Sequence, residues 1–352
     1  MSIEKTKFGV TRNNQEVFLF TLRNKNGMTV KITNYGAIIT AIELPGQNGK
    51  PENIVMGFDT LEAYTNKTYL NNCPFFVSLL GRYANRIKNG EFYINRKKYK
   101  VTQNLGQHHL HGGAYGFDKV VWEPMKTVSM KGQDILQLGY YSYDGEEGFP
   151  GNVQVYTVYQ LLDDNSLFFI VKAKADRPTH LNVTQHTYFN LNGMKSKIWD
   201  HRVMINSNDI TETDKDLIPT GTLQGVIEAD MNFRSMQSLK KFRDKPDFMG
   251  FDHNFVLQPD PYKHYFAAIV EDPESGRKMK LLTNQPGLQF YTANGLDGSY
   301  TGTQGQAYHP YDALCLEPQG FPDTPNNTHF PPITFLRPNK LYHHQTEYRF
   351  EF

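Results

Sequence analysis

Seven turn dipeptides, spread over almost the whole chain, restrict the fold more than any other feature of the sequence. They are Asn26-Gly27, Asn48-Gly49, Asn89-Gly90, Asp144-Gly145, Asn192-Gly193, Asn294-Gly295 and Asp297-Gly298. Asn-Gly and Asp-Gly are favoured in two-residue hairpin turns, because the left-handed backbone conformation costs these residues little. Their distribution predicts antiparallel hairpins throughout the chain.

The segments between these turns have the alternation of strands. Residues 153–175 contain two alternating apolar and polar runs around a turn, and residues 92–101 contain two shorter ones. Helical periodicity is confined to residues 59–70, for which Asp59 is the predicted cap, and to residues 235–244. We therefore predict an all-β fold, a large antiparallel β-sandwich with a few short helices, in which all 352 residues (1–352) form one domain.

Charge balance and cysteine content limit the partners and the compartment. The formal net charge is +1 and 21% of the residues are charged, so no electrostatic field favours nucleic acid or an anionic membrane. Cys73 and Cys315 form no disulfide framework, which favours a reducing compartment. The N-terminus has no signal-peptide pattern, and no apolar run reaches about 18 residues. We expect a cytoplasmic protein, monomeric or weakly homodimeric, that binds neither nucleic acid nor membranes.

The stretch 181–193, LNVTQHTYFNLNG, contains the central candidate, His186. On a strand, alternation puts one polar, hydrogen-bonding set on a single face: Asn182, Thr184, His186, Tyr188 and Asn190. A half-buried strand that faces water usually carries Lys, Glu or Ser at such positions. A histidine in a structural hydrogen-bond network and a functional histidine both fit this pattern.

Two arginines stand four residues apart in the motif GRYANRI. On a regular strand, Arg82 and Arg86 would share one face about 13 Å apart, at ~3.3 Å per residue. Both could not bind one small ligand at that distance, so we expect one to bind and the other to be structural. Two ordinary surface arginines are the alternative.

Three histidines, His108, His109 and His111, precede Gly112-Gly113. His109 and His111 would share a strand face, as zinc ligands can, but there is neither a nearby cysteine nor an HExxH spacing. A metal site is therefore the less favoured interpretation. The two glycines predict a sharp turn that lets the backbone approach a ligand closely, with His111 pointing into that space.

Two carboxylates end or begin apolar runs. Asp252 can accept two hydrogen bonds from vicinal hydroxyls, or it can serve as a turn or cap residue. Glu317 follows the apolar strand 313–316 and is either a solvated carboxylate or a general base. Upstream, Gln289 and Tyr291 share one strand face.

Taken together, these motifs resemble the galactose mutarotase (aldose 1-epimerase) family. The matching stretches, in chain order, are GRYANRI, HLHGGAYGFDKVVW, DGEEGFPGN, NVTQHTYFNL, FDHNF, LQFYTAN and LEPQGFPDTPN. They cover nearly the whole chain, although no single motif is specific. The resemblance implies one large β-sandwich domain, the galactose mutarotase-like supersandwich, that interconverts the anomers of free hexoses without cofactor or metal.

The resemblance also implies a role for each candidate. His186 matches the general acid that protonates the ring oxygen, and Glu317 matches the general base that takes the proton of the C1 hydroxyl. His111 matches a second histidine near the ring oxygen, and Arg82 would be structural. The remaining matches are sugar-binding positions: Asn85, Arg86, Asp252 and Gln289.

Two departures from the family pattern concern Gln185, where many members have Asn, and residues 295–311. The latter are rich in Gly and Tyr and contain no Lys or Arg, so this loop is expected to affect sugar preference. With ordinary pKa values, Glu317 is an anion at neutral pH. We therefore expect the site to favour the cationic form of His186, through Glu317 or Asp252.

The preferred function is mutarotation of free hexoses such as D-galactose and D-glucose, and four alternatives stay open. A glycoside hydrolase would use Asp252 and Glu317 about 5–10 Å apart. A hexose-phosphate epimerase would need more arginines than Arg86. A non-catalytic sugar-binding module would have no need of His186 with Glu317. A maltose-acting epimerase would depend on the room that the 295–311 loop leaves.

Overall fold

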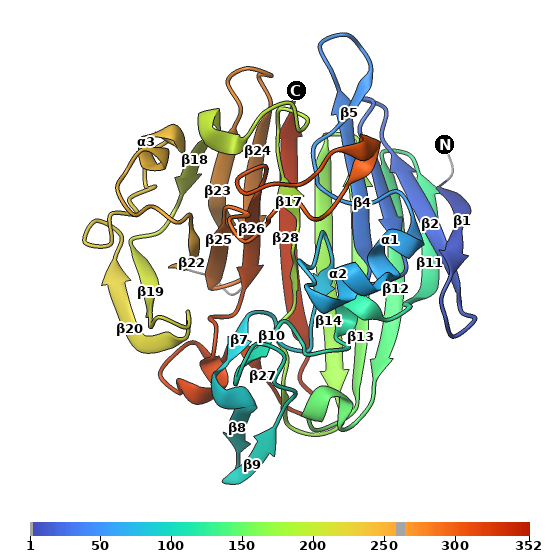
Figure 1. The fold of residues 1–352 in the computed structure, drawn as a ribbon. Helices are drawn as coiled ribbons and strands as arrows, with labels where there is room; N and C mark the ends of the chain where they lie inside the picture. Colours follow the sequence, from blue (N-terminus) through green and yellow to red (C-terminus); the bar gives the residue numbers. More distant parts are fainter. Residues whose placement is uncertain (1–2, 258–264) are drawn as a thin grey trace.

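The computed structural model describes residues 3–257 and 265–352, and three antiparallel sheets dominate this part of the chain (Figure 1). The five-stranded sheet has the order β1 (Glu4–Val10), β2 (Glu16–Arg23), β3 (Thr29–Thr33), β4 (Ile38–Pro45) and β5 (Pro51–Asn53). The nine-stranded sheet has the order β11 (Glu123–Met130), β12 (Gln133–Ser142), β13 (Val153–Leu162), β14 (Ser166–Ala175), β28 (Tyr342–Glu351), β24 (Lys278–Thr283), β23 (Tyr265–Glu271), β18 (Arg202–Ile205) and β21 (Gln237–Ser238). The six-stranded sheet has the order β17 (Tyr188–Phe189), β26 (Leu314–Gln319), β25 (Gly287–Tyr291), β22 (Asp252–Val256), β19 (Asp209–Thr213) and β20 (Pro219–Gly225).

The remaining strands pair in twos outside these three sheets. They are β6 (Leu79–Leu80) with β16 (Thr184–Gln185), β7 (Arg86–Ile87) with β10 (His109–Leu110), β8 (Glu91–Ile94) with β9 (Lys97–Lys100), and β15 (Thr179–His180) with β27 (Phe335–Leu336). The α-helices are short: α1 (Leu61–Thr65), α2 (Lys67–Asn71) and α3 (Lys240–Arg243).

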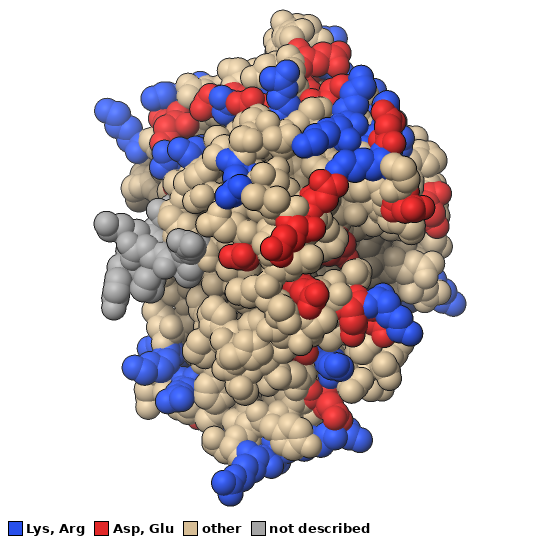
Figure 2. Space-filling view, turned by 90° about the vertical axis from the view of Figure 1, so that its left-hand side faces the viewer, with Lys and Arg blue, Asp and Glu red and all other residues tan. Residues whose placement is uncertain are grey.

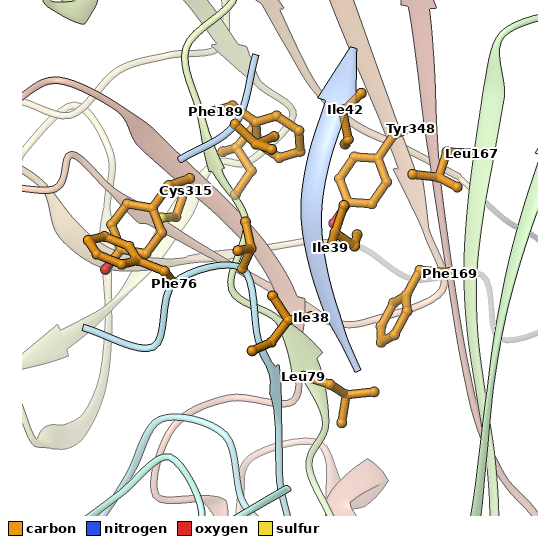
Figure 3. Close-up of a cluster of buried hydrophobic side chains, with 14 of the residues drawn as sticks. Ile38, Ile39, Ile42, Phe76, Leu79, Leu167, Phe169, Phe189, Cys315 and Tyr348 are labelled. Atoms are coloured by element: carbon orange, nitrogen blue, oxygen red, sulfur yellow. The ribbon is translucent and has the colours of Figure 1, made fainter. Parts of the chain in front are cut away.

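The sheets stack as a sandwich in which the nine-stranded sheet is the rear layer of Figure 1. The five-stranded sheet covers its β11–β14 half, and the six-stranded sheet covers its β28–β18 half. One buried hydrophobic cluster draws side chains from all three sheets, from Val17 to Phe350. In Figure 3, Ile39 of β4 lies beside Tyr348 of β28, with Phe169 of β14 close by. Apolar side chains from both layers therefore share one core.

The predicted hairpins are present where local alternation was strongest. β13 and β14 pair over their whole length around the turn at 163–165, and β8 and β9 form the hairpin expected in residues 92–101. Three of the seven turn dipeptides join neighbouring strands, namely those at Gly27, Gly49 and Gly145. The other four lie in irregular connections. The prediction of hairpins throughout the chain is therefore too broad.

The predicted helices are shorter than expected. Residues 59–70 contain two helices instead of one, because the Asn66 side chain accepts a hydrogen bond from the Tyr69 backbone N–H and starts α2. The cap of α1 is Thr60, not Asp59. In the other predicted helical stretch, only α3 is helical.

The stretch 181–193 is not one strand with a solvent-facing side. It makes the two-residue pairings of β16 and β17 and isolated bridges from Asn182 and Phe189, and residues 179–192 are all buried. Gln185, on the face opposite His186, is as buried as the rest and accepts a hydrogen bond from the Tyr159 hydroxyl at 2.8 Å. The segment is enclosed by both layers, and its amide side chains bond inside the protein, as Asn182 does with the Gly320 carbonyl. The hydroxyls of Thr184 and Thr187 have no partner among the described residues.

The two arginines of GRYANRI do not share a strand face, because Asn85 between them has a left-handed φ of 66°. The buried guanidinium of Arg82 donates to Ser142 Oγ and to the Tyr143 carbonyl, both at 2.6 Å, and to the Pro150 carbonyl at 3.2 Å. The prediction that Arg82 is structural is confirmed. Burial also lowers its pKa to about 10.

Basic and acidic side chains are intermixed on the face shown in Figure 2, without a continuous basic surface. Within residues 3–257 and 265–352, no helix is both long and apolar enough to cross a membrane.

Replacing Arg82 with Met should lower the free energy of unfolding by about 3 kcal/mol, because two carbonyls and a hydroxyl lose their donor inside the protein. Urea denaturation of the purified variant measures the change. Arg96→Met, at the exposed turn of the β8–β9 hairpin, is the matched control and should change stability by less than about 0.5 kcal/mol. Equal effects of both variants would contradict the structural role of Arg82.

Candidate active site

A cavity of about 570 Å³ lies at the exposed face of the six-stranded sheet, walled on its other sides by residues 72–75 and 295–300. Its lining contains every candidate predicted from the sequence: Asn85, Arg86, His111, His186, Asp252, Gln289 and Glu317. These residues come from segments up to 232 positions apart (85 to 317), so the fold alone brings them together.

Strand register places the central residues on one face of the sheet. Gln289 of β25 stands directly opposite Glu317 of β26, and Tyr291 of β25 stands opposite Asp252 of β22. Because side chains alternate along a strand, Gln289 and Tyr291 point the same way, toward the cavity. On the other side of β26, Tyr188 of β17 is paired with Cys315. His186, two positions before Tyr188, reaches the same cavity.

His186 and Glu317 meet at the base of the cavity. Nε2 of His186 lies 3.6 Å from Oε1 of Glu317, and both side chains are almost fully buried. The imidazole stacks on the Tyr188 ring, with ring centroids 4.8 Å apart and an interplanar angle of 17°. Its backbone N–H donates to the Ser78 carbonyl at 2.9 Å. Stacking therefore orients the ring, and the hydrogen bond to Ser78 anchors its backbone, before any ligand enters.

Burial favours the neutral forms of both groups. It lowers the pKa of the His186 imidazole to about 4. Burial, reinforced by the charge of Asp252 and opposed by Arg86, raises the pKa of the Glu317 carboxyl well above its usual value. The expectation that the empty site favours cationic His186 is wrong, because the neighbouring carboxylates do not compensate for lost hydration. Both shifts act in the same direction and favour a protonated Glu317 beside a neutral His186 in the substrate-free protein.

His111 has a fixed tautomer. Its Nδ1 accepts a hydrogen bond from the Asn85 backbone N–H at 3.0 Å. The backbone N–H of His111 in turn donates to the Asn85 carbonyl at 3.0 Å. Burial, with the nearby His186 and Arg86, lowers the pKa of His111 well below its usual value. A neutral ring whose Nδ1 is an acceptor carries its proton on Nε2, so His111 offers the cavity one neutral donor.

The glycines after His111 form the predicted sharp turn and approach other parts of the protein closely. At Gly112, with φ of 92°, a Cβ atom would collide with the Gly81 carbonyl. At Gly113 it would collide with the Glu147 carboxylate, which accepts backbone N–H groups of the same turn. This close packing fixes the direction in which His111 enters the cavity.

Arg86, Asp252 and Gln289 form a hydrogen-bonded row. Gln289 Nε2 donates to Asp252 Oδ1 at 2.5 Å, and Arg86 Nη2 lies 3.4 Å from Asp252 Oδ2. Asp252 begins strand β22, so the turn or cap interpretation is wrong. Three buried polar atoms of the described cavity have no partner in the protein: Arg86 Nε, Gln289 Oε1 and Glu317 Oε2. A donor and two acceptors of this kind suit a ligand rich in hydroxyl groups.

The structure separates the two histidines considered as a zinc pair. Nδ1 of His109 lies 2.7 Å from the Thr102 carbonyl, and the ring packs on Phe149, whereas His111 lines the cavity. The described residues do bring His186, Cys315 and Glu317 within 4.8 Å of one another. However, the thiol lies against Nδ1 and the carboxylate against Nε2. Since a metal ion binds along the lone pair of one ring nitrogen, this arrangement does not suit a single ion.

Among the residues at the site that the sequence did not single out, two contact the active-site histidines. Phe75 packs edge-to-face on His111, with centroids 4.7 Å apart, and no sequence pattern marked it. Cys315 contacts His186 through its sulfur, and here a signal existed, because a residue two positions before Glu317 on a strand shares its face.

Known proteins match this chain over almost its full length, in sequence and in structure. The sequence matches the family model described as aldose 1-epimerase over residues 19–349. The galactose mutarotase of Bos taurus is 40% identical over 324 residues, which cover 92% of this chain and 91% of the relative. The aldose 1-epimerase of Escherichia coli (strain K12) is 33% identical over 338 residues, 94% of each chain. A crystal structure of an aldose epimerase homologue from C. elegans has a TM-score of 0.85 and 28% identity, and covers 95% of this chain and 98% of that one.

The chain belongs to the aldose 1-epimerase family. The resemblance read from the motifs is thereby confirmed. The predicted β-sandwich fold class and the predicted enzyme class, an isomerase of the aldose 1-epimerase type, are confirmed with it.

Replacing Asp252 with Asn should move both limbs of the pH profile of kcat/KM to lower pH. The negative charge of Asp252 raises the pKa of Glu317 and also that of His186, so removing it lowers both pKa values. Initial rates measured by polarimetry across the pH range give the profile. The exposed Asp230→Asn is the control and should leave both limbs in place. A shift of the D252N profile to higher pH would contradict this electrostatic account.

Proposed function

We propose that this chain interconverts the α and β anomers of free hexoses such as D-galactose and D-glucose, by ring opening and reclosure. One observation supports this above all: Nε2 of His186 and Oε1 of Glu317 lie 3.6 Å apart at the base of a cavity whose other polar atoms suit hydroxyl groups. All 352 residues are proposed to form one catalytic domain, since a single core joins the three sheets.

Mutarotation needs one group to remove the proton of the C1 hydroxyl while another protonates the ring oxygen. We assign the first role to Glu317 and the second to Nε2 of His186. The ring then opens to the aldehyde, rotation about C1–C2 exchanges the two faces, and reclosure returns both protons to their starting holders. No net proton or electron is consumed.

The proton count of the pair explains how a neutral resting site can begin this reaction. The resting pair, protonated Glu317 with neutral His186, holds one proton, and so does the working pair of carboxylate and imidazolium. A bound sugar favours the working form, because its C1 hydroxyl donates to the carboxylate and its ring oxygen accepts from Nε2. The burial that favours the neutral pair also limits how long the charged one persists.

The remaining predicted residues are proposed to bind and orient the sugar. Asp252 accepts from vicinal hydroxyls, while Arg86 and Gln289 hold this carboxylate and offer their own unpartnered atoms. His111 donates from Nε2, and Asn85 fixes that tautomer through its backbone. Orientation of this kind adds to the roughly 10²–10⁴-fold that a positioned acid or base supplies.

The alternatives fit the site less well. Among the described residues lining the cavity, Arg86 is the one Lys or Arg, and it is paired with Asp252, so a phosphate clamp is missing. A binding module would gain nothing from burying His186 against Glu317. Residues 295–300 line the cavity, where the Tyr300 hydroxyl donates to the Asn72 carbonyl at 2.7 Å. This loop is proposed to set the preference among hexoses and maltose.

We further propose that the protein acts in the cytoplasm on free monosaccharides in hexose and galactose metabolism, as a monomer or weak homodimer. Two unpaired cysteines, Cys73 and Cys315, support a reducing compartment.

Replacing Glu317 with Gln, or His186 with Asn, should lower kcat by about 10²–10⁴-fold each, because each loses its proton-transfer group. Polarimetry of freshly dissolved α-D-galactose and α-D-glucose measures the rate. Glu228→Gln on the exposed surface is the control and should keep the full rate. Unchanged rates in either active-site variant would remove that residue's role, and new reducing ends from a glycoside would favour a hydrolase.

A further inference from the structure

Cys315 lies directly behind the proposed general acid. It stands on β26 two residues before Glu317 and opposite Tyr188 of β17. Its Sγ lies 3.5 Å from Nδ1 of His186, within hydrogen-bond distance for sulfur. The side chain is fully buried among the hydrophobic core residues, beside Phe76 in Figure 3. The imidazole is therefore placed between a thiol on one nitrogen and a carboxyl on the other.

The two ring nitrogens of His186 have different tasks. Nε2 faces Glu317 and the cavity, and it must release and regain a proton in each turnover. It can do so at moderate cost only if Nδ1 keeps its own proton throughout. If Nδ1 were the unprotonated nitrogen, loss of the Nε2 proton would leave an imidazolate anion, which a buried site does not tolerate.

We propose that Cys315 is a positioning residue that fixes the tautomer of His186, with Nδ1–H donating to Sγ so that Nε2 alone exchanges protons with the sugar. This inference rests on the proposed role of His186 as general acid. No bond to sulfur forms or breaks. The Nε2 proton passes to the ring oxygen and returns on reclosure, while the Nδ1 proton and the thiol proton stay where they are.

A thiol suits this task because it is neutral. Burial raises the pKa of Cys315 well above its usual value, so the sulfur remains a thiol and a weak acceptor. A carboxylate at the same position would stabilise the imidazolium and hold the proton that Nε2 must give away. The sulfur instead orients the ring, together with the stacked Tyr188, without adding charge.

The protonation of the ring nitrogens tests this assignment directly. In substrate-free protein labelled with ¹⁵N-histidine at neutral pH, the two-bond ¹⁵N–¹H spectrum of His186 should show a protonated Nδ1 and an unprotonated Nε2. The resonances are assigned by their loss in His186→Asn. A ring protonated on Nε2 alone would overturn the proposal, whatever the activity of the variants.

Two variants separate hydrogen bonding from packing. Cys315→Ala removes the acceptor and should give mixed tautomers, with kcat about tenfold lower and KM nearly unchanged. Cys315→Ser has a similar volume to Ala but keeps an acceptor, so it should restore the wild-type tautomer and most of kcat. Equal loss in both variants, with equal loss of thermal stability, would mean that Cys315 only fills space. Failure of the acid–base assignment itself is seen separately, as full activity in H186N or E317Q.

Discussion

The burial of an imidazole and a carboxyl group against each other is the constraint on which the site depends. Nε2 of His186 and Oε1 of Glu317 are 3.6 Å apart, and solvent reaches neither side chain to any useful extent. The two groups share one proton, so its transfer leaves the total charge of the pair unchanged, but it creates two buried charges that need the hydrogen bonds of a bound sugar. The sandwich keeps His186 out of water because it encloses residues 179–192 between its layers.

Some of the surrounding residues hold the pair in position, and others have polar atoms available to a ligand. Tyr188 and Cys315 hold the imidazole from its face and from its far nitrogen. Arg86 and Gln289, by contrast, have buried polar atoms without a partner among the described residues. Leaving such atoms unpaired costs stability, and this cost is offset when hydroxyl groups of a ligand fill the cavity.

Local patterns in the sequence predicted the local structure, and long-range pairing decided the rest. The β13–β14 hairpin follows from alternation around a turn, and the candidate residues follow from motifs that resemble a family. No local pattern predicts that Gln289 stands opposite Glu317, because register between β25 and β26 is set by the whole sheet. For the same reason, the sequence did not predict the burial of residues 181–193 or the lowered pKa of His186. Both depend on layers formed by distant segments.

The protonation state of Glu317 in the substrate-free protein tests the central claim most directly. Difference infrared spectroscopy between wild type and Glu317→Gln at neutral pH resolves the carboxyl stretch of this one residue. The account predicts a protonated carboxylic acid band in the wild type that is absent from the variant. A carboxylate band for Glu317 under the same conditions, with no acid band, would contradict it.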